Sequence, residues 1–296
     1  MSVGSRRDAR PPRVAQTLAL TTLAMFAFAG NSLLCRFALR ETAIDAASFT
    51  SLRLASGALA LALIVRFRGG GNVRRAGDWR AALALFAYAA SFSFAYRSLP
   101  AGTGALLLFG AVQVTMITQG LLKGERLGAL QMAGFVAACG GLTALMLPGV
   151  HAPSLMASIL MAGAGMAWGV YSLRGRGSKD PLAVNAGNFG RASVLTLILS
   201  GVLWPMAELD APGVACAIVS GALTSGVGYA IWYTALRALS ATQAAVVQLT
   251  VPVIAALGGV GLLGEALTLR LMVTSTIVLG GVAAVIVGAS RRIRAA

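Results

Sequence analysis

Two arginines, Arg53 and Arg191, stand inside long apolar runs, where a charged side chain has the largest chemical consequence. A charge at the centre of a bilayer costs at least ~2.5–3.5 kcal/mol on insertion scales, so such groups usually face a cavity or a partner. A guanidinium suits a substrate carboxylate geometrically, and Arg191, nearer the middle of its run, is the stronger candidate for substrate binding. For Arg53, close to the start of its run, the alternative is a stem that reaches the interface.

Uncharged polar and aromatic side chains inside the other apolar runs are candidates for lining a wet cavity. A buried amide in lipid either hydrogen-bonds to a neighbouring helix or faces water. A deep tyrosine or tryptophan presents a flat apolar face with one polar tip, but near a helix end it is an ordinary interface anchor. The amides in question are Asn31, Gln113, Gln119, Asn185, Asn188, Gln243 and Gln248, and the aromatic residues are Tyr88, Trp168, Tyr171, Tyr229, Trp232 and Tyr233.

Chemistry other than binding is not indicated. Gly69-Gly70-Gly71 lacks the following Lys-Ser/Thr pair of a phosphate-binding loop. His151 lies in a predicted loop and no span centre holds Asp or Glu, so hydrolysis by a Ser/His pair or by two carboxylates has no support. The three cysteines have no metal-ligand spacing. We therefore predict that the chain is not an enzyme and has no catalytic residues, no metal site and no cofactor.

The composition indicates the class of protein that positions these candidate residues. Of 296 residues, 57% are hydrophobic and 11% are charged, against roughly 25% charged residues in soluble domains. This is the composition of an integral membrane protein whose partner is the lipid bilayer. The net charge of +15 fits cytoplasmic loops rich in Lys and Arg better than nucleic-acid binding.

Apolar runs long enough to cross the hydrocarbon layer recur throughout the chain. Because backbone groups in lipid must pair internally, we expect helices, in an all-α membrane protein. The ten predicted spans are residues 14–35, 46–65, 79–96, 99–122, 127–147, 154–173, 182–204, 212–236, 240–263 and 271–289.

The basic residues predict the orientation of these spans. Eighteen of the 24 lie at the two ends and in alternate connections, all on one side of the ten-span arrangement. Lys and Arg mark the cytoplasmic side. We therefore expect a multi-pass protein of a bacterial inner (plasma) membrane with both termini in the cytoplasm and its first helix retained.

An internal repeat predicts the architecture. At an offset of 140 residues, thirteen positions between 95 and 145 are identical, including Arg97 with Arg237 and Gly124-Glu125 with Gly264-Glu265. Arg53 matches Arg191 at an offset of 138. Five spans per copy is an odd number, so the copies enter the membrane in opposite directions, as in many secondary transporters. We predict two inverted five-helix repeats, residues 1–149 and 150–296.

The paired Gly-Glu motifs in a five-plus-five chain resemble the drug/metabolite transporter superfamily, specifically its EamA-type exporters. Ala29-Gly30-Asn31-Ser32 and Ala167-Trp168-Gly169-Val170-Tyr171 look like the paired opening segments of that family. Pro252, thirteen residues before Glu265, also fits, whereas the first half has Val112 at the equivalent position. As a whole the chain is similar to the bacterial aromatic amino-acid exporter branch.

The resemblance places the fourth and ninth spans beside the pathway, which favours Gln113 and Gln248 among the amides. Gly110 and Pro252 are the expected gating or hinge positions. The expected cavity residues are Asn31, Tyr88, Gln113, Trp168, Tyr171, Arg191, Tyr229 and Gln248.

The expected function is export of small metabolites, amino acids with aromatic or apolar side chains, by alternating access in a monomer or weak homodimer. No proton-coupling site is evident, because Glu125 and Glu265 are expected to be solvated carboxylates that fix helix junctions. The alternatives are an exporter of lipophilic drugs and, in another class, a membrane-embedded enzyme or binding protein. Small-residue patterns at Gly140/Ala144 and Gly280/Ala284/Gly288 predict close packing of the fifth and tenth spans.

Overall fold

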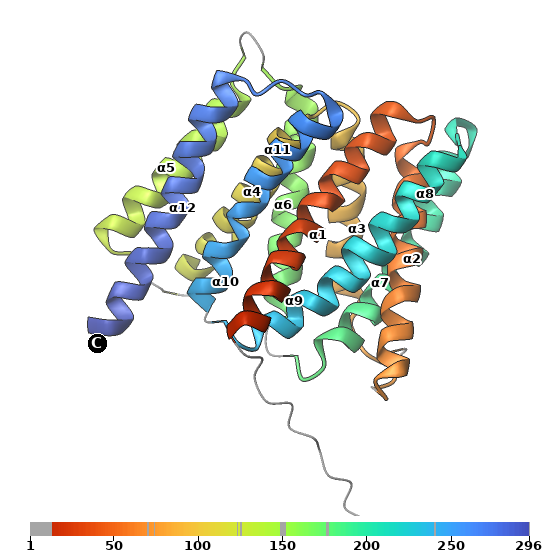
Figure 1. Cartoon of the computed structure of the whole chain (residues 1–296), viewed down its shortest axis with the longest axis horizontal. Helices are drawn as coiled ribbons and strands as arrows, with labels where there is room; N and C mark the ends of the chain where they lie inside the picture. The colour runs from red at the N-terminus through yellow and green to blue at the C-terminus, as the bar shows by residue number, and fades with distance from the viewer. Residues whose placement is uncertain are drawn as a thin grey trace, which may run out of the picture.

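The computed structural model describes residues 14–295 apart from 70, 74, 123, 125, 149–151, 176–177 and 240. This part of the chain is helical throughout, joined by short turns (Figure 1). The first half contains α1 (Val14–Glu41), α2 (Ala46–Phe67), α3 (Trp79–Tyr96), α4 (Ala101–Leu122) and α5 (Ala129–Met146). The second contains α6 (Leu155–Gly175), α7 (Pro181–Val202), the 3₁₀ turn η1 (Trp204–Met206), α8 (Ala211–Val219), the π-helical segment η2 (Ser220–Val227), α9 (Gly228–Leu236), α10 (Ala241–Gln248), α11 (Thr250–Leu263) and α12 (Leu269–Ala295).

All ten predicted spans are helices, with two differences in detail. The eighth span is the continuous series α8–η2–α9, and the ninth is divided into α10 and α11 at Leu249. Within the described residues, nine helices or helix series are long and apolar enough to cross a membrane. The 18-residue α3 corresponds to the remaining predicted span and is not among these nine. The prediction of an all-helical membrane protein is confirmed.

Several helices begin at an aspartate. Asp45, Asp78, Asp180 and Asp210 each precede a helix, and each side chain accepts a hydrogen bond from a backbone N–H of the first turn. These N–H groups have no partner within the helix, so an N-cap carboxylate satisfies them. Four of the nine acidic residues of the chain are used in this way.

The contacts between helices follow the repeat. In the first half α3 and α4 pack against α6, and their counterparts α9 and α11 pack against α1. Two further pairs, α2 with α7 and α5 with α12, join equivalent helices of the two halves. Because each half has five spans, α1 and α6 cross in opposite directions (Figure 1). The two halves are therefore inverted copies, and the helices of each half pack against those of the other.

The pair α5–α12 stands at one edge of the molecule (Figure 1). The predicted packing of these spans is present, and one of the predicted glycines takes part, since a Cβ at Gly288 would lie 2.6 Å from Cγ of Gln131. Two glycines outside the predicted patterns make the closest backbone approach. A Cβ at Gly134 would lie 2.4 Å from the carbonyl oxygen of Gly281, and a Cβ at Gly281 would lie 2.6 Å from that of Gly134. Gly140 and Gly280 have no such neighbour within 4 Å. The repeat predicted which helices pack together. The rotation of each helix about its own axis determines which of its residues form the contact.

Candidate functional site

A cavity of about 850 Å³ lies between the two halves and is lined by α1, α3, α4, α6, η2, α9 and α10 and by the start of α7. It extends to the exposed side chains Arg68, Lys179 and Arg237, which mark the end of α2, the α6–α7 connection and the end of α9. We call this the terminal face, because the start of α1 and the end of α12 lie on the same side (Figure 1). The cavity is therefore open at the terminal face.

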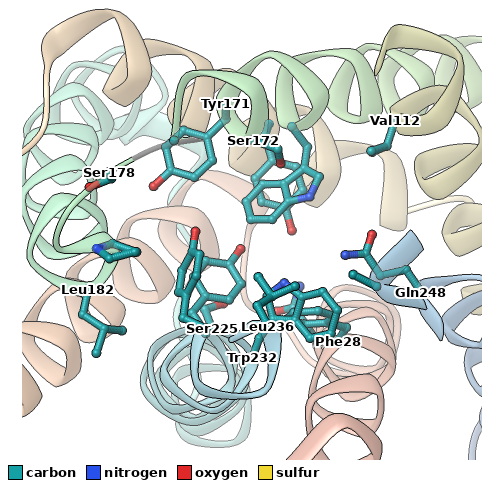
Figure 2. Close-up of a pocket in the computed structure, with 18 of the residues that line it drawn as sticks. Phe28, Val112, Tyr171, Ser172, Ser178, Leu182, Ser225, Trp232, Leu236 and Gln248 are labelled. Atoms are coloured by element: carbon teal, nitrogen blue, oxygen red, sulfur yellow. The ribbon is translucent and has the colours of Figure 1, made fainter. Parts of the chain in front are cut away.

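Aromatic rings form much of the wall. Trp168 is central, with its ring centroid 4.8 Å from that of Tyr88 and 5.4 Å from those of Tyr171 and Tyr229. Phe28 continues the series, 5.9 Å from Tyr229. Figure 2 shows Tyr171 and Ser172 of α6 on one wall and Trp232 and Leu236 of α9 on the opposite wall. Such a lining favours a flat apolar group.

Amide side chains supply polar groups on the remaining walls. Gln113 of α4 and Gln248 of α10 line the cavity, and neither side chain has a hydrogen bond to the described part of the chain. Gln248 extends inward from its helix in Figure 2. Each amide thus has donor and acceptor groups available to a ligand.

Asn31 has a different environment. Its Oδ1 accepts hydrogen bonds from Ser220 Oγ at 2.7 Å and Thr224 Oγ1 at 3.3 Å. Both hydroxyls belong to η2, so Asn31 joins α1 to the π-helical segment at the cavity wall. Within this segment a Cβ at Gly221 would lie 2.0 Å from the carbonyl oxygen of Arg53. The widened turn thus packs directly against α2, and π-helical turns are frequent at functional sites.

Seven of the eight predicted cavity residues line this one cavity: Asn31, Tyr88, Gln113, Trp168, Tyr171, Tyr229 and Gln248. Arg191 does not. Its Nη1 donates to the carbonyl oxygens of Ala76 and Gly187, and its guanidinium lies 6.0 Å from the ring centroid of Trp79. Arg191 therefore anchors the α2–α3 connection, because its position in the helix turns it away from the cavity.

Sequence reasoning left out several lining residues. Phe28, Phe92 and Thr224 also face the cavity. Trp232, one of the aromatic candidates but not one of the eight expected cavity residues, lines it as well, three residues after Tyr229 on the same face of α9. Thr224 lies in the π-helical segment, whose changed rotation is not evident from residue spacing.

Arg53 lies beside the cavity but does not reach the interface. Its side chain is 2% exposed, and Nη2 donates to Tyr88 Oη at 2.8 Å. The guanidinium carbon lies 5.2 Å from the ring centroid of Tyr88 and 4.8 Å from that of Phe92. Both rings line the cavity, so the charge is held directly behind its wall.

The opposite side of the molecule, which includes turns 42–45 and 97–100 and is called the far face below, is closed by an ion pair. Arg36 Nε lies 2.9 Å from Glu265 Oε1, and Glu265 Oε2 accepts from the backbone N–H of Ala101 at 2.7 Å. Arg36 Nη1 also donates to the carbonyl oxygens of Tyr96 and Arg97. Glu265 fixes a helix junction as predicted, but it is buried and paired rather than solvated. Glu125 lies outside the described residues.

The hinge candidates differ from each other. Pro252 follows the division between α10 and α11 at Leu249. At Gly110, α4 continues as one unbroken helix, and a Cβ would meet the Leu142 side chain at 2.7 Å. The ninth span is interrupted three residues before Pro252, whereas the described α4 has no interruption at Gly110.

Ten membrane helices in two inverted halves, around a cavity open at one face and closed at the other, define the class of secondary transporters. The chain belongs to the EamA-like transporter family, whose sequence model matches residues 16–147 and 155–287, one match in each half. It is therefore a multi-pass membrane transporter with a small-molecule substrate, not an enzyme. The resemblance is confirmed for the family, and the amino-acid branch stays a prediction.

The chain is also similar to two other proteins. The chain is 57% identical over 271 residues to "Uncharacterized protein PA1977" of Pseudomonas aeruginosa, covering 92% of this chain and 94% of that protein. It also resembles a protein of known crystal structure, with a TM-score of 0.66 and 19% identity over 93% of this chain and 98% of the other. The second likeness supports the fold alone.

Proposed function

We propose that this protein exports amino acids with aromatic or apolar side chains from the cytoplasm of a bacterium across its inner membrane. The observation that carries the proposal is the lining of the cavity, in which a wall of aromatic rings faces the free amides of Gln113 and Gln248. Rings accommodate the side chain, and amides hydrogen-bond to amino and carboxylate groups. The volume lies within the ~300–1,000 Å³ usual for small-molecule sites.

The orientation supports export. Basic connections mark the cytoplasmic side, and the exposed cations Arg68, Lys179 and Arg237 lie at the terminal face, where the cavity opens. In this state the site would take substrate from the cytoplasm and release it after the far face opens. The cavity lies within a single chain, which is consistent with a functional monomer or weak homodimer.

An exporter of lipophilic cationic drugs is the alternative. A nearby carboxylate favours a cationic cargo, and the charged lining residues within the described part of the chain are three basic residues and Asp180. This balance disfavours a cationic cargo.

Counterflow in proteoliposomes tests the proposal. Vesicles loaded with unlabelled phenylalanine, tryptophan or threonine are diluted into the same labelled amino acid. We expect transient accumulation of phenylalanine or tryptophan, and no uptake of a quaternary ammonium dye. Preferential transport of the dye over all three amino acids would refute the proposed substrate.

Two variants on one helix provide the control. Gln113→Leu removes a lining amide, whereas Gln119→Leu makes the same change in α4 at a position that does not line the cavity. We expect counterflow to fall in the first variant and to be retained in the second. Equal transport by both variants would show that Gln113 does not contribute to the substrate site.

A further inference from the structure

Among the described residues, no carboxylate is paired with the buried Arg53 guanidinium. Its Nε and Nη1 have no hydrogen-bond partner in this part of the chain, and its one hydrogen bond there is to the Tyr88 hydroxyl. Within the described part of the chain no carboxylate forms a salt bridge with it. The titratable side chains that act on it are two tyrosines and a cysteine, Tyr88, Tyr229 and Cys35, and none of them is a carboxylate.

Such an arrangement is unfavourable for a residue that serves only the fold. An arginine stays charged in proteins, and a buried charge needs a partner to offset its lost hydration. Faces of Tyr88 and Phe92 provide cation–π contacts, but they leave two of the three guanidinium nitrogens unpaired. An ionisable group at membrane depth therefore points to a ligand.

The cavity provides the place for that ligand. Tyr88 Oη accepts from Arg53, so its own proton is available to donate, and it has no acceptor in the described part of the chain. Phe92, whose ring centroid lies 5.4 Å from that of Tyr88, lines the same cavity, as do Asn31 and Ser32 of α1. At the other end, the three basic residues of the mouth raise the positive potential along the entry route.

We propose that Arg53 and Tyr88 form the subsite for a substrate carboxylate, and that this subsite determines the selectivity of the transporter for acids over amines. The carboxylate accepts the Tyr88 hydroxyl proton in a hydrogen bond while the Arg53 charge behind it is neutralised. The adjoining aromatic side chain lies along the wall formed by Trp168 and Tyr229. The inference rests on the proposed function in that it takes this cavity as the cargo site.

The test compares matched ligands that share a phenyl ring. Phenylalanine carries both charges, 3-phenylpropanoate only the carboxylate, and phenethylamine only the ammonium group. Binding is followed by fluorescence quenching in a W79F/W204F background, which leaves Trp168 and Trp232, both of which line the cavity. We expect phenylpropanoate to bind the parent protein about tenfold or more tightly than phenethylamine.

Arg53→Met keeps the length of the side chain and removes its charge. We expect the preference for phenylpropanoate over phenethylamine to disappear, while the melting temperature of the ligand-free protein is maintained or raised. Tyr88→Phe keeps the ring and should weaken carboxylate binding by a smaller factor. Arg191→Met removes the equivalent charge of the second repeat, outside the cavity, and should leave the preference intact.

The outcomes separate the two proposals. Binding of phenylpropanoate without binding of phenylalanine would refute the amino-acid cargo and support the carboxylate subsite. No binding of phenylpropanoate, equal binding of phenethylamine to the parent protein, or an undiminished preference in Arg53→Met would each overturn the subsite. A large fall in melting temperature in Arg53→Met with unchanged preference would identify Arg53 as a structural residue.

Discussion

The Arg36 guanidinium and the Glu265 carboxylate meet at 2.9 Å across 229 residues of sequence. Their side chains are 9% and 6% exposed, and among the described residues this is the one salt bridge with both partners buried. Gly264 makes the contact possible, because its positive φ of 63° ends α11 and lets the backbone of Glu265 return to the carbonyl oxygen of Gly259 at 3.0 Å. The Gly-Glu motif thus places a carboxylate under the far face.

This ion pair joins α1, the α3–α4 turn and the α11–α12 turn, so opening of the far face must separate them. Glu265→Gln leaves Arg36 as an unpaired buried charge, and breaking a buried pair in this way costs about 3–5 kcal/mol. We expect the variant to populate the state in which the far face is open. Transport would then be impaired, because the closed state would be hard to restore.

Accessibility measures this change. Ser32 lines the cavity, and Ser32→Cys, with the three native cysteines replaced, should react with an impermeant thiol reagent mainly from the terminal face. Adding Glu265→Gln should increase labelling from the far face several-fold. The control is Glu41→Gln, which removes the partner of Arg40 in a pair that is 44% and 45% exposed. Equal labelling in the two variants would contradict the closing role of Glu265.

The fold was predictable from the sequence because the bilayer restricts the choices. Apolar runs of sufficient length must be helices, and matching pairs such as Arg97 with Arg237 revealed the duplication. The sequence did not predict which way individual side chains point from their helices. Arg53 and Arg191 occupy matching positions in the repeat, yet one lies behind the cavity wall and the other binds the α2–α3 connection. A repeat fixes which helices correspond but not their rotation.

The burial of Glu265 also lay beyond sequence reasoning. Position at a helix end indicated solvent, whereas the partner that buries it, Arg36, belongs to another helix. In the same way, Thr224 of the π-helical turn donates a hydrogen bond to Asn31, which belongs to a distant helix, α1. Long-range contacts of this kind have no local pattern.

Adjacent glycines in α12 test the packing of the edge pair. In Gly281→Ala the new Cβ would lie 2.6 Å from the carbonyl oxygen of Gly134 and 2.8 Å from the backbone nitrogen of Ala138, so α5 and α12 must separate. We expect a loss of about 1–3 kcal/mol, the usual cost of overpacking. Thermal unfolding in detergent measures it.

The neighbouring position provides the control. Gly280→Ala has no atom within 4 Å of the new Cβ, and alanine favours the helix by up to about 1 kcal/mol. Its melting temperature should be equal to or above that of the parent protein. A comparable loss in both variants would show that the α5–α12 contact differs from the one described.

Pro252 tests the break in the ninth span. It has no backbone N–H, so the carbonyl oxygen of Gln248 has no helical donor four residues on, and the interruption at Leu249 lies next to a cavity-lining side chain. If the break is part of the gate, Pro252→Ala should fold normally and transport about tenfold more slowly, a barrier increase of about 1.4 kcal/mol. Pro212→Ala, in the exposed first turn of α8, should transport normally. Unchanged kinetics in Pro252→Ala would leave the proline a static feature.

The last prediction concerns energy coupling. A proton-coupled carrier usually holds an Asp, Glu or His where it can load and release a proton within the pathway. Among the described residues of the span interiors the charged group beside the cavity is Arg53, which keeps its proton. Glu265 is held by Arg36 at the far face, away from the cavity lining.

We therefore expect substrate to move down its own gradient without obligatory proton exchange. A zwitterion carries no net charge, so a membrane potential, worth ~2.3 kcal/mol per charge per 100 mV, should not alter its rate. The measurement is phenylalanine flux in proteoliposomes with an imposed pH gradient, with an imposed potassium diffusion potential, and with neither. Equal initial rates are expected in all three. Accumulation against the phenylalanine gradient that requires the pH gradient would overturn this prediction, and loss of that requirement in Glu265→Gln would identify Glu265 as the proton site.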